Sequence, residues 1–365
     1  MRYIEFSAII LIFIGVNVYV FYRLFLMLPV ILPLQILLIV SAVVVQLPFF
    51  ISIFFGSRLP VNLVSLLYKI GTSWLIVFVY LFLIFIVCDI VRLLHLINID
   101  RFMFHSWLGW CVLIGFISVL LFIGNKNYYS KKRVELDLKI EKTIKSPLKI
   151  VLISDLHLGY GIGKDELEQW INLINTEKPD AVLIAGDVVD NYLPLLNNEK
   201  IYKSLRKIKS RYGTFMSLGN HEYFGNIDKR LDFFEKSSIR VLRDSAILVD
   251  SNFYIVGRDD ASRKYRNSLE NLTANLDHSK CIIVLDHQPS GFEEAQNCGV
   301  DLLLSGHTHH GQVFPLNLIA KAFFGKPYGY YKNNNTNFYV TSGIGLWGGK
   351  FRLGTRSEYV VITIK

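Results

Sequence analysis

The sequence predicts an N-terminal module of four membrane-crossing helices followed by a soluble α/β domain. Charge is distributed unevenly, because residues 1–125 hold only six Lys or Arg and three Asp or Glu residues, of 39 and 30 in the 365-residue chain. After residue 148, short apolar runs alternate with amphipathic segments, which is typical of a parallel sheet with crossover helices. Side chains that bind metals follow several of these runs, so the edge of the sheet is predicted to carry the chemistry.

Four apolar segments are long enough to cross a bilayer, for which about 20 residues are needed. They run approximately through residues 5–27, 31–55, 71–94 and 105–124. We therefore assign residues 1–125 to a transmembrane helical module. A basic juxtamembrane segment with an edge strand follows at 126–147, and the soluble domain occupies 148–365.

Basic residues flanking the four segments indicate the orientation of this multi-pass module. Seven lie on the side of the soluble domain: Arg2, Arg58, Lys69, Lys126, Lys131, Lys132 and Arg133. Three lie on the other side: Arg23, Arg92 and Arg101. This asymmetry predicts a cytoplasmic soluble domain in an inner or cell membrane. Asp89, Arg92, His95 and Asp100 fall at the end of the third segment, where we expect an interfacial cluster rather than a transport relay.

The formal net charge of +9 is consistent with contact to anionic membrane lipids. We do not expect a nucleic-acid partner, because no basic stripe is interleaved with aromatic residues. The four scattered cysteines contain no CxxC pair, which argues against a disulfide framework or a zinc ribbon. Oligomeric state is left open.

The most informative stretch is an apolar run at 149–153 that ends in Ser154, Asp155, Leu156 and His157. Its length and β-branched composition predict a buried strand. If the backbone stays extended, the period of two turns the side chains of Asp155 and His157 the same way.

Four later stretches repeat this order of apolar strand and polar ligand. A helix at 164–176 precedes a strand at 181–185, and a helix near 199–210 precedes a strand at 214–218. Further strands are expected at 281–285 and 300–304. The polar residues at these strand ends are Asp187, Asp190, Asn220, His221, His287, His307 and His309. Together with His157 and His310, six of the nine histidines lie in the turns after these five strands, which argues against a purely structural role because buried polar groups are costly without partners.

Imidazole and carboxylate ligands together suit divalent Mn, Fe or Zn. Asp187 has two oxygens and can bridge two such ions. A pair of metal ions can activate water and clamp a phosphoryl group. Glycines beside the ligands, at positions 186, 219 and 306, are expected to allow tight turns and close backbone approach.

The motifs DxH, GDxxD, GNHE, an isolated His and GHxH, in this order, resemble the calcineurin-like metallophosphoesterase family. The resemblance implies a double β-sheet sandwich flanked by helices and two divalent metal ions. By motif, Asp155, His157 and His309 would bind one metal and Asn220, His287 and His307 the other, with Asp187 bridging. His221 would donate a proton or hydrogen bond to the phosphoryl or leaving oxygen, and Asp190 would orient it. A metal-bridging hydroxide would then hydrolyse a phosphate ester, diester or pyrophosphate.

The C-terminal residues Gly343–Gly348, Arg352, Gly354 and Glu358 resemble membrane-associated bacterial members of this family. His310 stands where those members usually have Gly, as either an extra phosphate contact or a tolerated surface residue. The resemblance implies a phosphorylated small-molecule or lipid substrate, for example UDP-diacylglucosamine, and leaves protein phosphatase and soluble nucleotide phosphodiesterase activity open. The alternative is a non-enzymatic membrane sensor that binds phosphorylated ligands, which would be expected to lack a metal ligand or His221.

The apolar stretch 314–331 follows the last ligands directly. One interpretation is a flap that admits a lipid tail beside the metals. The other is a helix and turn that pack into the core.

Overall fold

The computed structural model describes residues 2–142, 144–190 and 193–365. Thr143, inside the predicted 126–147 segment, lies outside the described residues. The chain divides into two compact units, Met1–Gly124 and Asn125–Lys365, which are described separately.

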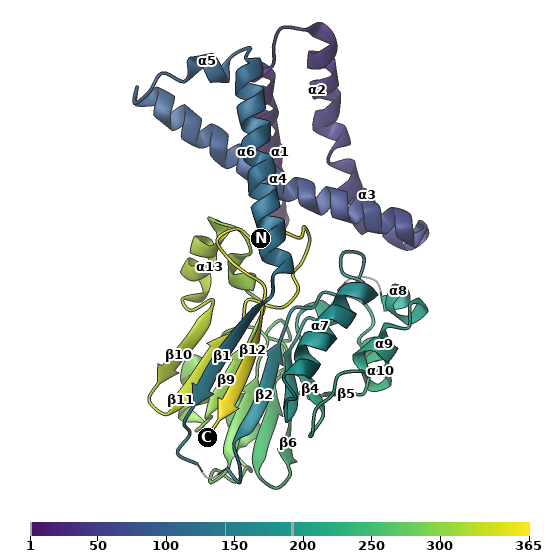
Figure 1. Cartoon of the computed structure of the whole chain (residues 1–365), viewed down its shortest axis with the longest axis vertical. Coiled ribbons are helices and arrows are strands. Elements are labelled where there is room, and N and C mark those ends of the chain that lie inside the picture. Colours follow the sequence, from purple (N-terminus) through teal and green to yellow (C-terminus); the bar gives the residue numbers. More distant parts are fainter. Residues whose placement is uncertain (1, 143, 191–192) are drawn as a thin grey trace. The chain divides into compact units, whose positions relative to one another are not determined.

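The N-terminal unit is helical. Its elements are α1 (Arg2–Met27), α2 (Leu32–Val44), α3 (Leu47–Phe54), η1 (Gly56–Arg58), α4 (Val61–Leu93), α5 (Asp100–Met103) and the greater part of α6 (Trp107–Tyr129) (Figure 1). In the described part of the chain, three helical stretches are long and apolar enough to cross a membrane: Leu32–Phe54, Val61–Leu93 and Trp107–Tyr129. Leu11–Met27 forms a shorter apolar helix among the residues searched. Helix α4 begins at Val61, earlier than the third predicted segment at 71–94, so it includes Lys69.

Charged groups near the end of α4 pair with one another. Arg23 Nη2 lies 2.7 Å from Asp89 Oδ1, and the Tyr19 hydroxyl donates to Asp89 Oδ2 over 2.6 Å. Arg92 Nε lies 2.7 Å from Asp100 Oδ1. These pairs compensate the charges locally, and such compensation is required where little water is available.

Two sheets form the framework of the second unit, and each has six strands among the described residues. The first has the order β1 (Lys132–Leu138), β12 (Glu358–Ile364), β2 (Leu148–Ile153), β3 (Ala181–Ala185), β4 (Thr214–Ser217) and β5 (Ile239–Val241). The second has the order β10 (Gly329–Asn333), β11 (Thr336–Val340), β9 (Leu302–Ser305), β8 (Cys281–Leu285), β7 (Phe253–Gly257) and β6 (Ser245–Val249). Buried side chains from both sheets, such as Ile150, Leu183, Phe253 and Ile283, form one core between them. The predicted double-sheet sandwich is therefore confirmed.

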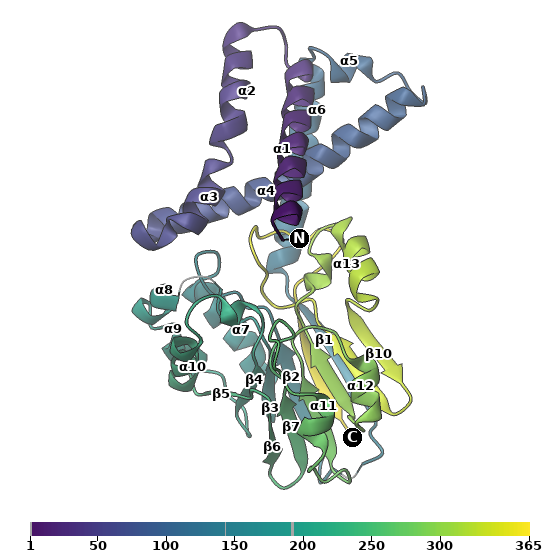
Figure 2. The ribbon, with the colours of Figure 1, turned by 180° about the vertical axis from the view of Figure 1, so that it is seen from behind.

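Helices cover the outer faces of this sandwich (Figures 1 and 2). On the first sheet lie α7 (Lys164–Thr176), α8 (Leu193–Asn198), α9 (Ile201–Leu205) and α10 (Ile227–Lys236); α11 (Leu269–Thr273) and α12 (Phe292–Asn297) lie on the second. The bounds of α7 are those predicted from its apolar periodicity. The helix predicted near 199–210 is shorter: α9 begins after Lys200, whose left-handed conformation with φ of 54° separates it from α8, and it ends at Leu205.

The strand directions bring the predicted ligands to one edge. β2, β3 and β4 are parallel neighbours in the first sheet, and β8 and β9 are parallel neighbours in the second. Because parallel strands end on the same side, the five loops that follow these strands can converge across the two sheets.

Candidate metal centre

Nine predicted site residues meet at the carboxyl ends of β2, β3, β4, β8 and β9. They are Asp155, His157, Asp187, Asp190, Asn220, His221, His287, His307 and His309. Most of these side chains are almost fully buried, although the strands end near the surface. The site therefore combines access at the sheet edge with the low dielectric of an interior.

One group of potential ligands consists of Asp155, His157 and His309. The Nε2 atoms of the two histidines face each other at 3.2 Å. Asp155 Oδ1 lies 3.6 Å from His309 Nε2 and 3.9 Å from His157 Nε2. The three donor atoms thus surround one small volume.

A second group consists of Asp187, His287 and His307. His287 Nε2 lies 3.1 Å from Asp187 Oδ2 and 3.2 Å from Asn220 Oδ1. Asn220 is therefore placed to add an amide oxygen to this group.

Asp187 lies between the two groups. Its Oδ2 atom, 3.1 Å from His287 Nε2, is also 3.8 Å from His157 Nε2 in the first group. Its Oδ1 atom accepts the backbone N–H of His221 over 2.9 Å, which fixes the carboxylate orientation. Asp187 also forms a third potential group with His157 and His221, so among the described carboxylates it alone is part of two groups.

The backbone at the ligands is not extended, so the period of two does not explain why the side chains of Asp155 and His157 point the same way. These two residues have φ of 55° and 46°, and Asp187, His307 and His309 also have positive φ. Residues other than glycine rarely adopt this left-handed backbone conformation, and such backbone strain is concentrated at functional sites. Asp155 and His157 point into one site because the loop winds, with Asp155 N bonded to Gly186 O and His157 N to Asp187 O.

Two of the predicted glycine positions show why a side chain is excluded. A Cβ atom at Gly219 would lie 2.2 Å from Asp187 Oδ1, and one at Gly306 would lie 2.5 Å from Asp155 Oδ2. Either substitution would displace a carboxylate of the site.

Burial and the neighbouring carboxylates set the pKa values of the imidazoles. It lowers the pKa of His157 and of His307 to about 4, and it lowers the pKa of His309 well below the usual range. Burial also disfavours the charged form of His287, but Asp187 and Asp155 raise the pKa of that imidazole well above its usual value. The first three imidazoles are therefore neutral at pH 7, which is the form that binds metals.

This donor set fits divalent metal ions. Two neutral imidazole nitrogens at 3.2 Å compete for at most one shared proton, whereas both lone pairs can bind a cation. Buried carboxylates beside them attract positive charge, and mixed nitrogen and oxygen ligands suit Mn, Fe or Zn. The residues could hold a metal on each side of Asp187.

His221 belongs to the potential ligand group that also contains His157 and Asp187. Its Nδ1 atom is 2.8 Å from Asp190 Oδ1, and its ring centroid lies 4.5 Å from that of His157. Burial disfavours protonation of His221, but the hydrogen bond to Asp190 and the charge of Asp187 raise its pKa overall. Because Nδ1 pairs with Asp190, Nε2 is the remaining ring nitrogen of His221.

Glu222 supports the site, a role that the sequence analysis did not assign. Its Oε2 atom accepts the backbone N–H groups of Asp187 and Gly219, over 2.9 and 2.8 Å. Its Oε1 atom accepts those of Val188 and Val189, over 2.8 and 3.0 Å. This fully buried carboxylate therefore joins the loops that follow β3 and β4. Glu222 is the last residue of the GNHE motif, but its contacts with the loop after β3 could not be predicted from that motif.

Arg352 supports the other side of the site and is also fully buried. Its Nη1 atom donates to His309 O over 2.6 Å. Its Nη2 atom donates to Ser342 O over 2.6 Å and to Gly345 O over 2.9 Å. The planar fork thereby ties the last ligand loop to the loop at 342–345.

We predict that Arg352→Lys lowers the free energy of unfolding by about 2–4 kcal/mol, because an ammonium group cannot satisfy these carbonyls at once. Thermal unfolding of the full chain in detergent measures the effect. The exposed Arg356 provides the matched control Arg356→Lys. Equal unfolding midpoints for the two variants would contradict the role given to Arg352.

His310 does not join the potential ligand groups of the described residues. Its ring stacks on Tyr328 with a centroid distance of 4.2 Å and an interplanar angle of 11°. This contact gives the His310 ring a packing role, which neither the phosphate-contact nor the surface-residue interpretation included.

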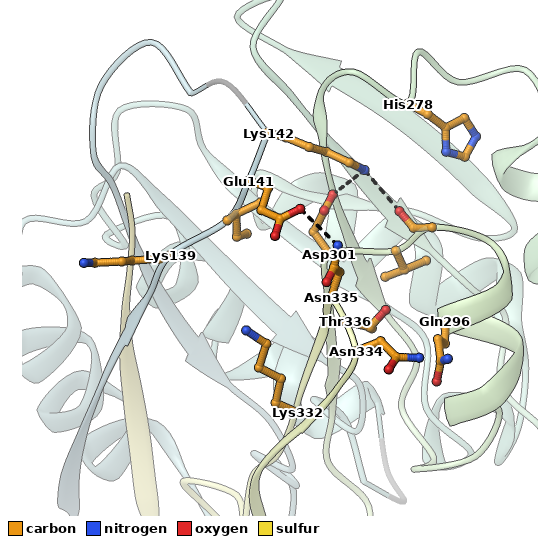
Figure 3. A pocket seen from close by; sticks show the side chains of 13 residues that line it. Lys139, Glu141, Lys142, His278, Gln296, Asp301, Lys332, Asn334, Asn335 and Thr336 are labelled. Atoms are coloured by element: carbon orange, nitrogen blue, oxygen red, sulfur yellow. Dashed lines mark hydrogen bonds and ion pairs between the residues drawn. The ribbon is translucent and has the colours of Figure 1, made fainter.

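A separate pocket of about 730 Å³ lies at the opposite end of β9, where Asp301 precedes the strand. Figure 3 shows Lys142 reaching Asp301 and Gly299, with Nζ distances of 2.7 Å to Asp301 Oδ2 and 3.1 Å to Gly299 O. Asn335 Nδ2 donates to Glu141 over 3.0 Å. These contacts fasten the segment after β1 to the second sheet, and none of the nine site residues lines this pocket.

The second unit is similar to several known proteins. Residues 148–311 match the family model described as Calcineurin-like phosphoesterase. An uncharacterized metallophosphoesterase of Campylobacter jejuni is 34% identical over 260 residues, 68% of this chain and 68% of that protein. A transmembrane protein with metallophosphoesterase domain from Danio rerio is 32% identical over 254 residues, 64% of this chain and 57% of that protein. The solved structure of Haemophilus influenzae NAD nucleotidase has a TM-score of 0.38 and 18% identity, covering 55% of this chain and 45% of the nucleotidase.

Proposed function

Because the chain belongs to the calcineurin-like metallophosphoesterase family, an enzyme family that hydrolyses phosphoric esters, we propose that its site is a dimetal phosphoesterase centre. The substrate would be a phosphate ester, a diester or a pyrophosphate. The observation that carries this proposal is the position of Asp187, whose Oδ2 atom lies 3.1 Å from His287 Nε2 in one group of potential ligands and 3.8 Å from His157 Nε2 in the other. A single metal would need only one of these groups.

We assign the ligands by their grouping. Asp155, His157 and His309 would hold one metal ion, and Asn220, His287 and His307 the other. Asp187 would contact both. When bound, Mn, Fe or Zn ions would lower the pKa of a water molecule and neutralise charge on the phosphate.

The chain's own residues would position and protonate the substrate. His221, held through Nδ1 by Asp190, would offer Nε2–H to the phosphoryl or leaving oxygen. General acid catalysis of this kind contributes roughly 10²–10⁴-fold to a rate. Asp190 would act as a positioning residue, since it sets both the ring orientation and the proton affinity of His221.

We predict that Asp190→Asn moves the loss of turnover at high pH to lower pH. The raised pKa of His221 means that its protonated form persists to higher pH than usual and is lost as the pH rises through that pKa. Without the carboxylate, the pKa falls and the loss occurs earlier. The pH profile of kcat for bis-p-nitrophenyl phosphate measures this, and an unchanged profile in a folded variant would contradict the role of His221.

We further propose that the enzyme is a multi-pass membrane protein with a cytoplasmic catalytic unit. Three helices of sufficient length and apolar composition support the membrane location, as does the Danio rerio relative that is named a transmembrane protein. The basic flanks support the orientation. Such an anchor favours a lipid-linked phosphate substrate, for example UDP-diacylglucosamine, over a freely soluble one.

The direct test is hydrolysis by the full chain purified in detergent. Chelation should abolish turnover of bis-p-nitrophenyl phosphate or of p-nitrophenyl phosphate, and added Mn²⁺ should restore it. Comparison of the two esters distinguishes diester from monoester activity. Binding of phosphorylated ligands without turnover of either ester would instead favour the sensor alternative.

A further inference from the structure

Helix α13 (Leu316–Phe324) directs apolar side chains to the surface of the catalytic unit. Phe323 is 81% exposed, Leu318 57% and Ile319 49%. Ala320 is the buried residue of this helix, so the core-packing interpretation of 314–331 does not describe α13. Phe314, directly before the helix, is also 52% exposed. Several large apolar side chains exposed on one short helix are typical of an interaction site.

The helix rests directly on the last ligand loop. A Cβ atom at Gly311 would lie 2.4 Å from the backbone nitrogen of Asn317, which shows how closely the loop and α13 approach. The ring of Phe324, at the end of α13, contacts the ring of His307 with centroids 5.7 Å apart. An apolar surface therefore begins at a proposed metal ligand and extends outward along the helix.

The same loop is attached to the end of α6, whose last residues belong to the catalytic unit. Asn127 Nδ2 donates to Arg352 O over 3.1 Å, and Arg352 in turn donates to His309 O. The backbone of Phe314 donates to Leu353 O over 2.8 Å. Since α6 is one of the helices that can cross a membrane, these hydrogen bonds connect the loop before α13, through Arg352 and Leu353, to the residues where α6 ends.

We propose that α13 and Phe314 dock into the acyl-chain region of the membrane leaflet that α6 enters, and that they guide a long-chain phospholipid to the metals. The proposal rests on the proposed phosphoesterase function and specifies its substrate class. Two exposed lysines, Lys321 on α13 and Lys326 just after it, suit anionic headgroups above the apolar chains. The apolar surface next to His307 would hold the first part of an acyl chain while the phosphate lies at the metals.

Photocrosslinking identifies what covers α13 without requiring catalysis. Benzoylphenylalanine replaces Phe323 in the full chain, reconstituted in nanodiscs of phosphatidylethanolamine and phosphatidylglycerol. We expect an adduct with the mass of one phospholipid. The same probe at Leu248, on β6 and 39% exposed, should give none. A crosslink to residues 2–124, a crosslink to a second copy of the chain, or no adduct at Phe323 would overturn the proposal.

A paired assay tests the consequence for the substrate. Phosphatidyl-p-nitrophenol in nanodiscs and bis-p-nitrophenyl phosphate in solution share a leaving group. For the variant Leu318→Ser/Phe323→Ser, the ratio of lipid to soluble turnover should fall roughly tenfold or more, since two apolar side chains no longer leave water. Leu248→Ser should leave the ratio unchanged.

An unchanged ratio in the α13 variant, with lipid turnover intact, would contradict the role of α13 in substrate delivery. If metal-loaded wild type hydrolysed neither ester, the phosphoesterase function would fail, whereas the crosslink would still decide the docking of α13. The two failures are therefore distinguishable.

Discussion

Asp187→Asn is expected to reduce metal-dependent hydrolysis by at least about 1,000-fold, because metal ions contribute several kcal/mol of charge stabilisation at the transition state. Asp187 lies between both groups of potential ligands, with Oδ2 3.1 Å from His287 Nε2 and 3.8 Å from His157 Nε2. An amide has nearly the same shape but no negative charge. The substitution should therefore weaken both metals while leaving the fold in place.

The measurement is kcat/KM for bis-p-nitrophenyl phosphate at saturating Mn²⁺, with bound metal determined on the same sample. Asp232→Asn is a matched control, because the Asp232 side chain is 57% exposed and pairs only at the surface with Lys236. A tenfold fall in rate corresponds to a loss of only about 1.4 kcal/mol of transition-state stabilisation. A variant at position 187 that keeps more than about a tenth of the wild-type rate would therefore contradict the bridging role.

Glu222→Gln is expected to lower the free energy of unfolding by about 3 kcal/mol, because it removes charge-assisted hydrogen bonds inside the protein. The glutamate accepts four backbone N–H groups from two loops. An amide nitrogen at one of its oxygens would face two N–H donors. Those donors would be buried without an acceptor, and the loop that carries Asp187 would shift.

Denaturant unfolding of the full chain in detergent, together with metal affinity, tests this expectation. Glu168→Gln is the control, since Glu168 pairs at the surface with Lys207 over 2.7 Å and should change stability by less than about 1 kcal/mol. If Glu222→Gln matched that control in both stability and metal affinity, Glu222 would not organise the site.

The elements that position the site were predictable where a single pattern controls them. The apolar runs at 181–185 and 281–285 have the bounds of β3 and β8, because a fully buried strand must be apolar throughout. The amphipathic period of α7 was equally clear. By contrast, α9 is shorter than predicted, since it begins only after the left-handed Lys200 and already ends at Leu205.

The supporting residues of the site could not be derived from periodicity. The contacts of Glu222 join loops after two different strands, and those of Arg352 join His309 to residues at 342–345. Likewise, the positive φ of Asp155 and His157 depends on hydrogen bonds to the loop after β3 rather than on local preference. Such long-range contacts become visible only once the sheets are assembled.

Metal stoichiometry measured alongside turnover tests the central claim most directly. Metal-free full chain is titrated with Mn²⁺, and bound metal and hydrolysis of bis-p-nitrophenyl phosphate and p-nitrophenyl phosphate are recorded at each step. The dimetal account predicts that turnover reaches its maximum at two bound ions per chain and is at least about 1,000-fold lower in Asp187→Asn. Full turnover with a single bound ion, or two bound ions without hydrolysis of either ester, would contradict it.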